Sequence, residues 1–161
     1  MDLSANYTFD APRQRVWDLL VDPKIIANCL PGCESLEPTG IDSFEAKLTV
    51  NLAAITGRFV GTVQMTDKSM PSRYTLKVEG RGTPGFVDGS ANISLTDTEN
   101  NGTTVCVSGT ANFGGTIARV GQRLLSSVSK MMIDRFFSCL QQAISSPIKE
   151  YLDIYMVYII Y

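Results

Sequence analysis

Alternating apolar and polar residues dominate the middle of the chain. From Ser43 to Leu52 every second residue is apolar, which is the period of a strand with one buried face. The alternation recurs in residues 59–65, 74–80, 87–95 and 105–111, and residues 2–9 also fit a strand. Turn signals such as Asn100-Asn101-Gly102 separate these segments. Strands that follow one another through short turns predict a curved antiparallel sheet with one face to cover.

Helical spacing replaces the alternation in three places. Asp10-Ala11-Pro12 resembles a helix start with Asp10 as the N-cap, and a second short helix is expected between Asp22-Pro23 and Pro31-Gly32. A continuous apolar face then predicts one helix of about thirty residues from Gly115 to about Ile144, opposite a polar face that includes Asp134. At ~1.5 Å per residue this helix is roughly 45 Å long, enough to cross the sheet. The predicted fold class is therefore α+β, with about seven strands, two short helices after the first strand and a long C-terminal helix.

Small residues on the inward face of the strands suggest a cavity under the long helix. These residues are Gly61, Gly80, Gly89, Ala91, Gly109 and Ala111, and Ala118 and Gly121 face them from the helix. Gly121 is expected where the helix approaches the sheet most closely. Glycine also lets a sheet bend and a helix approach, so a packed interior is the alternative. If the space exists, its wall should be apolar and should bind an apolar ligand. The expected ligand-binding residues are Trp17, Leu30, Phe59, Val63, Leu76, Val87, Val107, Gly121, Leu124, Val128 and Met131.

Charge and composition exclude several classes of function. The formal net charge of -2 gives no basic field for nucleic acid. The chain has no histidine, which removes the commonest general base and metal ligand. We therefore predict no catalytic residues, no metal site and no cofactor, and expect that the protein is not an enzyme. A cyclase-like or hydrolase-like enzyme is a weaker alternative, because the inward positions offer only Tyr74 and nearby hydroxyls.

The four cysteines do not form a recognisable redox motif. Cys29 and Cys33 have three residues between them, so the sequence favours a structural turn over a thioredoxin-type pair. Cys106 and Cys139 are single and are expected to be buried as small apolar residues. The first thirty residues lack a signal-peptide pattern, which predicts a cytoplasmic location with reduced thiols.

The C-terminal segment differs in character from the rest. We predict a ligand-binding domain over residues 1–146 and an apolar tail over 147–161. Residues 154–161 are all apolar or aromatic, yet eight residues fall far short of the ~20 that a spanning helix needs. The tail could contact a membrane peripherally or pack against the protein itself, and the sequence favours neither.

Three segments resemble a known family. They are residues 11–23, the run Cys29-Leu30-Pro31-Gly32-Cys33-Glu34, and residues 114–125. Together they resemble the CoxG family, which is named after a subunit of carbon monoxide dehydrogenase and belongs to the START-like (SRPBCC) superfamily of helix-grip folds. The resemblance implies an accessory protein of a molybdenum-containing hydroxylase, with a hydrophobic cavity under the long helix and a link to the membrane or its quinone pool. It assigns no catalytic residues.

Two main functions therefore compete at this point. The first is a non-enzymatic carrier of a quinone-like or lipid-like molecule, held in the cytoplasm or peripherally on the cytoplasmic face of the membrane. The second is an assembly or recruitment factor that works through its outer surface without a ligand. Arg119 and Arg123 are the expected partner contacts in that case, with a molybdenum hydroxylase as the expected partner.

Overall fold

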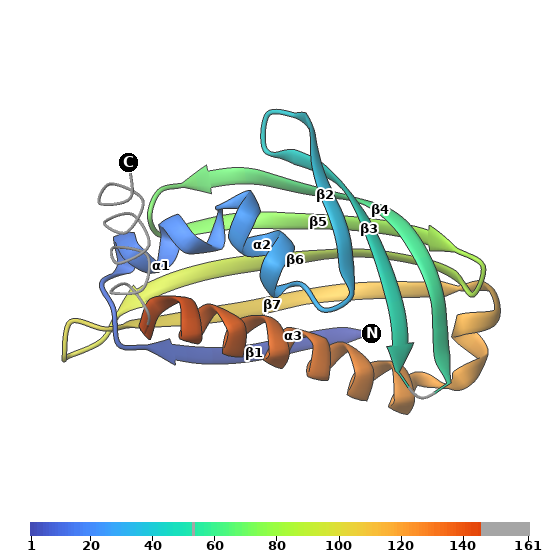
Figure 1. Ribbon diagram of the computed structural model, residues 1–161. Coiled ribbons are helices and arrows are strands. Elements are labelled where there is room, and N and C mark those ends of the chain that lie inside the picture. The colour runs from blue at the N-terminus through green and yellow to red at the C-terminus, as the bar shows by residue number, and fades with distance from the viewer. Residues whose placement is uncertain (53, 146–161) are drawn as a thin grey trace, which may run out of the picture.

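A single antiparallel sheet forms the body of the protein. The computed structural model describes residues 1–52 and 54–145. Seven strands lie in the order β1-β7-β6-β5-β4-β3-β2, so each strand after β1 pairs with the next one along the chain (Figure 1). The strands are β1 (Asp2–Phe9), β2 (Cys33–Gly40), β3 (Ser43–Leu52), β4 (Ile55–Ser69), β5 (Arg73–Gly82), β6 (Gly85–Asp97) and β7 (Thr103–Gly114). This confirms the predicted curved antiparallel sheet.

The helices gather on one side of this sheet (Figure 1). Two short helices follow β1, namely α1 (Arg13–Leu20) and α2 (Pro23–Cys29). The side chain of Asp22 caps α2 by accepting a 2.9 Å hydrogen bond from the backbone N–H of Lys24. The N-cap of α1 is Pro12 rather than the expected Asp10, and no side chain caps that helix. The long C-terminal helix crosses the face beside α1 and α2, as predicted.

The C-terminal helix is shorter than predicted, because its first turns have a different form. Residues Gly115–Val120 form a 3-10 helix, η1, and the α-helix α3 spans only Gln122–Ser145, or 24 residues. Gly121 separates the two with φ of +94° and ψ of 152°, a conformation that is essentially restricted to glycine. An ideal Cβ on Gly121 would meet no heavy atom within 4 Å. The prediction that Gly121 marks the closest approach of helix to sheet is therefore wrong, and the residue is a break between two helices.

The alternation correctly predicts which side chains face inward. Phe44, Ala46 and Val50 are buried on β3, and Val105, Val107 and Ala111 are buried on β7. The strand that the alternation did not identify is β2, whose residues are mostly exposed and include Pro38. This strand lies at the edge of the sheet, where proline and polar residues are tolerated.

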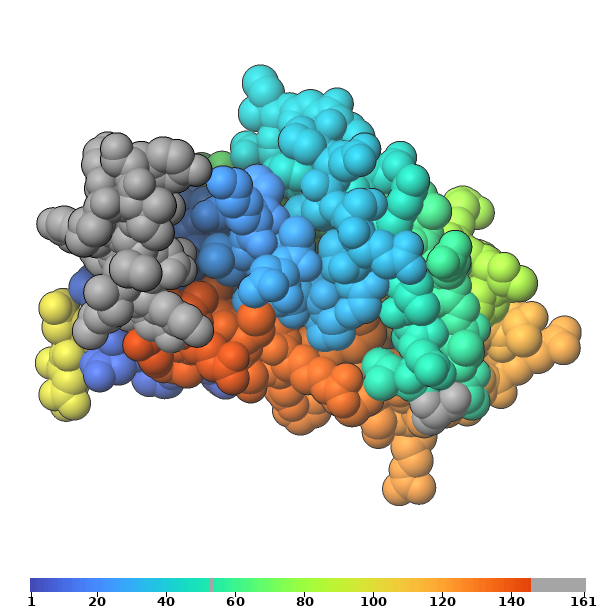
Figure 2. Space-filling model, viewed as in Figure 1, coloured from blue at the N-terminus to red at the C-terminus, as the bar shows by residue number. Residues whose placement is uncertain are grey.

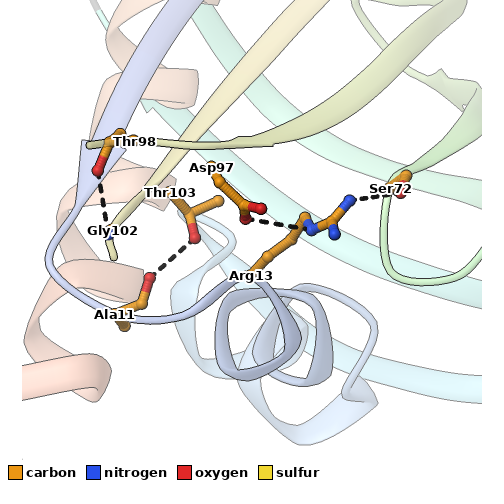
Figure 3. Close-up of polar contacts among 7 residues, drawn as sticks. All are labelled: Ala11, Arg13, Ser72, Asp97, Thr98, Gly102 and Thr103. Atoms are coloured by element: carbon orange, nitrogen blue, oxygen red, sulfur yellow. Dashed lines mark hydrogen bonds and ion pairs between the residues drawn. The ribbon is translucent and has the colours of Figure 1, made fainter. Parts of the chain in front are cut away.

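A polar cluster ties the start of α1 to two turns of the sheet (Figure 3). Nη1 of Arg13 donates a 2.8 Å hydrogen bond to Oγ of Ser72, and its Nε lies 3.3 Å from a carboxylate oxygen of Asp97. The fully buried Thr103 donates a 2.8 Å hydrogen bond from Oγ1 to the carbonyl oxygen of Ala11. These contacts fix α1 over one end of the sheet, where it closes the interior.

The apolar interior consists of two separate clusters. The larger one contains Trp17, Tyr74, Leu95, Phe137 and Leu140 and lies where α1 and the C-terminal half of α3 cover the sheet. The smaller one contains Val50, Phe59, Ile117, Leu125 and Val128 and joins η1 and the N-terminal half of α3 to β3 and β4. Figure 2 shows α3 (orange to red) running below the N-terminal helices (blue), with its N-terminal end beside the ends of β3 and β4.

Candidate functional site

An apolar cavity lies between the helices and the concave face of the sheet. Its volume is about 410 Å³, which falls in the range typical of small-molecule sites. Side chains from β3 to β7, the end of α2 and the middle of α3 line it. Val63, Leu76, Val78 and Val87 face inward but are only partly buried, because their free surface borders the cavity. The interior is thus not filled by side chains.

Glycines on the sheet form the floor of this cavity. Gly61 pairs with Gly80 across β4 and β5, and Ala91 pairs with Gly109 across β6 and β7. A Cβ on Gly61 or Gly109 would collide with a carbonyl of the neighbouring strand, while one on Gly80 would come within 3.2 Å of Val87. The glycines therefore allow close strand approach and also leave space above the sheet. The packed interior that the sequence left open as the alternative is not found, because the space is unfilled.

The wall opposite the sheet comes from α3. Leu125, Val128, Ser129, Met132 and Ile133 line the cavity, and Phe136 and Phe137 complete this wall. The apolar face expected from the sequence included Val128, Met132 and Phe136, and these three line the cavity. Leu124 and Met131, also expected on that face, lie outside the wall, whereas Leu125, Ile133 and Phe137 line it without having been expected there.

Seven of the eleven residues expected to bind a ligand line the cavity. These are Leu30, Phe59, Val63, Leu76, Val87, Val107 and Val128. Their contact with a ligand stays a prediction. The remaining four do not line it. Trp17 is 1% exposed within the larger cluster, Gly121 is exposed, and Leu124 and Met131 are partly buried outside the wall.

Several wall residues were not predicted to bind a ligand. Leu48 and Val78 were read as inward-facing from the strand alternation but were not among the expected ligand contacts, and Leu3 fits the same pattern. Leu20 and Ile26 come from the short helices, and their place could not be read from periodicity alone. Ile133 was not expected on the inner face of the helix, whereas Met132 was expected there and does line the cavity.

Few polar side chains reach the cavity. Glu79 borders it, but it lies between the inward-facing Val78 and Gly80, so its side chain faces the outer surface. Thr62, Ser90 and Thr110 also border it, but they are exposed and alternate with inward-facing residues, so their side chains face the outer surface as well. The hydroxyl-bearing residues that remain are Tyr74 on β5 and Ser129 on α3. Burial raises the pKa of Tyr74 above its ordinary value. The cavity therefore offers neutral donors and no charged side chain.

A disulfide joins two helices that cover the sheet. Cys29 at the end of α2 and Cys139 on α3 are bonded, with their Cα atoms 5.3 Å apart. The expectation that Cys139 is a single buried thiol is therefore wrong. The expectation that the thiols are reduced is also wrong for Cys29 and Cys139. Residues 110 positions apart in the chain meet only through the fold, so their separation in the sequence gives no indication of the bond. Cys33 and Cys106 are free.

The described residues offer few other sites. Across 1–52 and 54–145, no group of three or more histidine, cysteine, aspartate or glutamate residues could hold a metal ion. Within the same ranges no helix is both long and apolar enough to cross a membrane. Arg119 and Arg123 are exposed and form no ion pair with a described residue. The predicted tail, residues 147–161, lies outside the described residues.

Solved structures share this fold over nearly their whole length. A conserved protein from Geobacillus kaustophilus is 34% identical, with a TM-score of 0.88 over 90% of this chain and 95% of that chain. The ZhuI aromatase/cyclase from a Streptomyces species is 13% identical, with a TM-score of 0.67 over 89% and 92%. A protein from Thermus thermophilus is 16% identical, with a TM-score of 0.64 over 88% and 95%. These likenesses confirm the helix-grip fold.

A protein family matches this chain, although no curated protein does. Residues 7–145 match the family described as CoxG, a subunit of carbon monoxide dehydrogenase. That match starts within β1 and ends with α3, so it includes the sheet, the helices and the cavity between them. The chain belongs to the CoxG family of carbon monoxide dehydrogenase subunits.

Proposed function

We propose that this protein is a non-enzymatic carrier of a hydrophobic molecule that serves a molybdenum-containing carbon monoxide dehydrogenase or a related hydroxylase. The cavity of about 410 Å³ carries this proposal, because its wall is apolar and its volume is unfilled. An empty apolar space lacks the dispersion contacts of a packed core, and an apolar ligand restores them. The family name supports the choice of partner enzyme.

The residues of the cavity wall fit a carrier better than they fit an enzyme. General acid–base catalysis needs a group whose pKa lies near the working pH, within reach of the substrate. Tyr74 is the titratable side chain that faces the cavity, and burial moves its pKa further from neutrality. The likeness to an aromatase/cyclase concerns the fold, and different functions are common on one fold.

Extraction of the purified protein tests the proposal. Organic solvent should release a quinone-like or lipid-like molecule that mass spectrometry identifies. Val78→Trp places a large side chain in the cavity, while Lys77→Trp places the same side chain on the outer face of the same strand. The first variant should lose the bound molecule and the second should keep it. A folded protein that carries no apolar molecule and takes none up would contradict the carrier function.

A surface-acting recruitment factor is the second candidate. The exposed Arg119 and Arg123 favour it, because they lie four positions apart around the break at Gly121 and have no ion-pair partner among the described residues. Pull-down of a molybdenum hydroxylase should then fail for the double variant Arg119→Glu/Arg123→Glu and survive in Val78→Trp. Loss of pull-down in Val78→Trp alone would favour the carrier.

The location in the cell is part of the same proposal. A carrier that links an enzyme to a quinone pool would lie in the cytoplasm, peripherally on the cytoplasmic face of the membrane through its apolar tail. Cell fractionation of the full chain and of a variant ending at residue 146 tests this. The full chain should be found partly with the membrane fraction, and the shortened chain should not.

A further inference from the structure

The side chain of Tyr74 is buried, and its hydroxyl has no protein acceptor among the described residues. The side chain is 5% exposed and lines the cavity. Its ring packs edge-on against Trp17, with centroids 5.4 Å apart and planes at 88°, so the core holds the ring in place. No hydrogen bond joins its hydroxyl to any described residue, although a buried Tyr hydroxyl usually has a partner. Tyr74 lines the cavity, so we take the cavity as the free space that its hydroxyl borders.

The remaining wall limits what can sit beside this hydroxyl. An anion taken from water into an apolar site needs a cation or several donors to replace its hydration. The described residues that line the cavity include no lysine or arginine, and Glu79 turns its charge to the outer face. Ser129, on α3, adds one more neutral hydroxyl. The wall therefore suits a neutral molecule and opposes a carboxylate.

We infer that the Tyr74 hydroxyl donates a hydrogen bond to a neutral acceptor oxygen of the ligand, and that the cavity selects neutral carbonyl-bearing apolar molecules over fatty acids. This inference rests on the carrier function proposed above. Burial keeps the phenol protonated across the neutral pH range, so it remains a donor there. The hydrogen bond also fixes which end of the ligand enters the cavity, because an apolar wall alone distinguishes the two ends poorly.

A set of probes of equal chain length tests the inference. Undecanone, undecane and undecanoic acid compete with the neutral fluorophore N-phenylnaphthylamine, at a pH well above the carboxyl pKa. Undecanone should displace the fluorophore best, and undecanoate should displace it worst. Tyr74→Phe should weaken the binding of undecanone about 3- to 10-fold, as expected for one lost hydrogen bond, and should leave the binding of undecane unchanged.

Tyr7→Phe is the matched control. It removes a tyrosine hydroxyl that bonds Asp134 and does not line the cavity, so the ratio of ketone to alkane affinity should stay that of the wild type. The infrared carbonyl stretch of bound undecanone gives a second readout, and it should lie at lower frequency in the wild type than in Tyr74→Phe.

The outcomes separate the two proposals. If N-phenylnaphthylamine fails to bind the wild type, the carrier function and the inference are both overturned. If it binds but Tyr74→Phe leaves the ketone-to-alkane ratio and the carbonyl frequency unchanged, only the inference is overturned. Tighter binding of undecanoate than of undecanone would also overturn the inference but not the carrier function.

Discussion

The hydroxyl of Tyr7 donates a 2.6 Å hydrogen bond to Oδ1 of Asp134 and so joins the first strand to the last helix. The two residues lie 127 positions apart in the sequence. The ring of Tyr7 also stacks on Phe137, with centroids 4.2 Å apart, and Lys130 lies 3.6 Å from the other carboxylate oxygen of Asp134. These contacts hold α3 against β1.

Removing this hydrogen bond should destabilise the protein measurably. Tyr7→Phe should lower the free energy of unfolding by about 1–2 kcal/mol, since the acceptor is charged but the site is only partly buried. Urea unfolding measures the change. Tyr74→Phe is the control, because its hydroxyl has no protein acceptor among the described residues and its loss should cost less. Equal losses in the two variants would contradict the structure.

Stability should fall at high pH through the same tyrosine. Burial, and then the hydrogen bond to Asp134, raise the pKa of Tyr7 above the ordinary value of 10.0. The unfolded chain therefore loses this proton at a lower pH than the folded protein. The stabilisation is complete below about pH 10 and is lost as the pH rises from there toward the folded pKa. Urea midpoints across this range should decline more steeply in the wild type than in Tyr7→Phe, and parallel declines would refute the assignment.

The disulfide between α2 and α3 should contribute strongly to stability. It closes a loop of 110 residues, for which the chain-entropy account gives an upper value of about 4–5 kcal/mol. Cys29→Ser, Cys139→Ser and reduction by dithiothreitol should each lower the melting temperature by a similar amount. Cys33→Ser should leave it nearly unchanged, because Cys33 is free. Four titratable thiols in the native protein as isolated would show that the bond is absent there.

A side chain at Gly121 should cost stability without any steric clash. Its φ of +94° and ψ of 152° suit glycine, and a Cβ would find open space. Gly121→Ala should therefore lower the free energy of unfolding by about 1–3 kcal/mol through backbone strain alone. Gly80→Ala is the comparison, because Gly80 has ordinary backbone angles and its Cβ would press on Val87. Thermal unfolding that is unaffected by Gly121→Ala would mean that η1 and α3 join in another way.

The sequence predicted those parts of the fold that follow from local periodicity. Alternation placed the inward faces of five strands, and the small residues Gly61, Gly80 and Ala91 correctly indicated unfilled space above the sheet. The inward face of such a strand can be read from the sequence, because apolar residues recur at every second position when one side of a strand is buried. The edge strand β2 has little buried surface, so it leaves no such pattern.

The features that the sequence did not predict depend on a single backbone angle or on long-range contacts. The conformation of Gly121 divides the expected helix into η1 and α3. Leu125 lines the cavity although the sequence did not place it on the inner face, while Leu124 and Met131 lie outside the wall. Trp17 was placed on the cavity wall, but α1 buries it behind Tyr74. The Cys29–Cys139 bond joins elements that meet only after folding.

Two neighbouring methionines on α3 give a direct test of the helix rotation. Met132 lines the cavity, whereas Met131 is also partly buried but lies outside the wall. Met132→Trp should fill the space and weaken N-phenylnaphthylamine binding by at least about tenfold, because overlap with a ligand in a close-packed site is not relieved easily. Met131→Trp should leave binding within about twofold of the wild type, since the added volume lies outside the cavity. Fluorescence titration of both variants, with circular dichroism to check that each is folded, distinguishes the two faces. A stronger effect from Met131→Trp than from Met132→Trp would contradict the orientation of α3 in the structure.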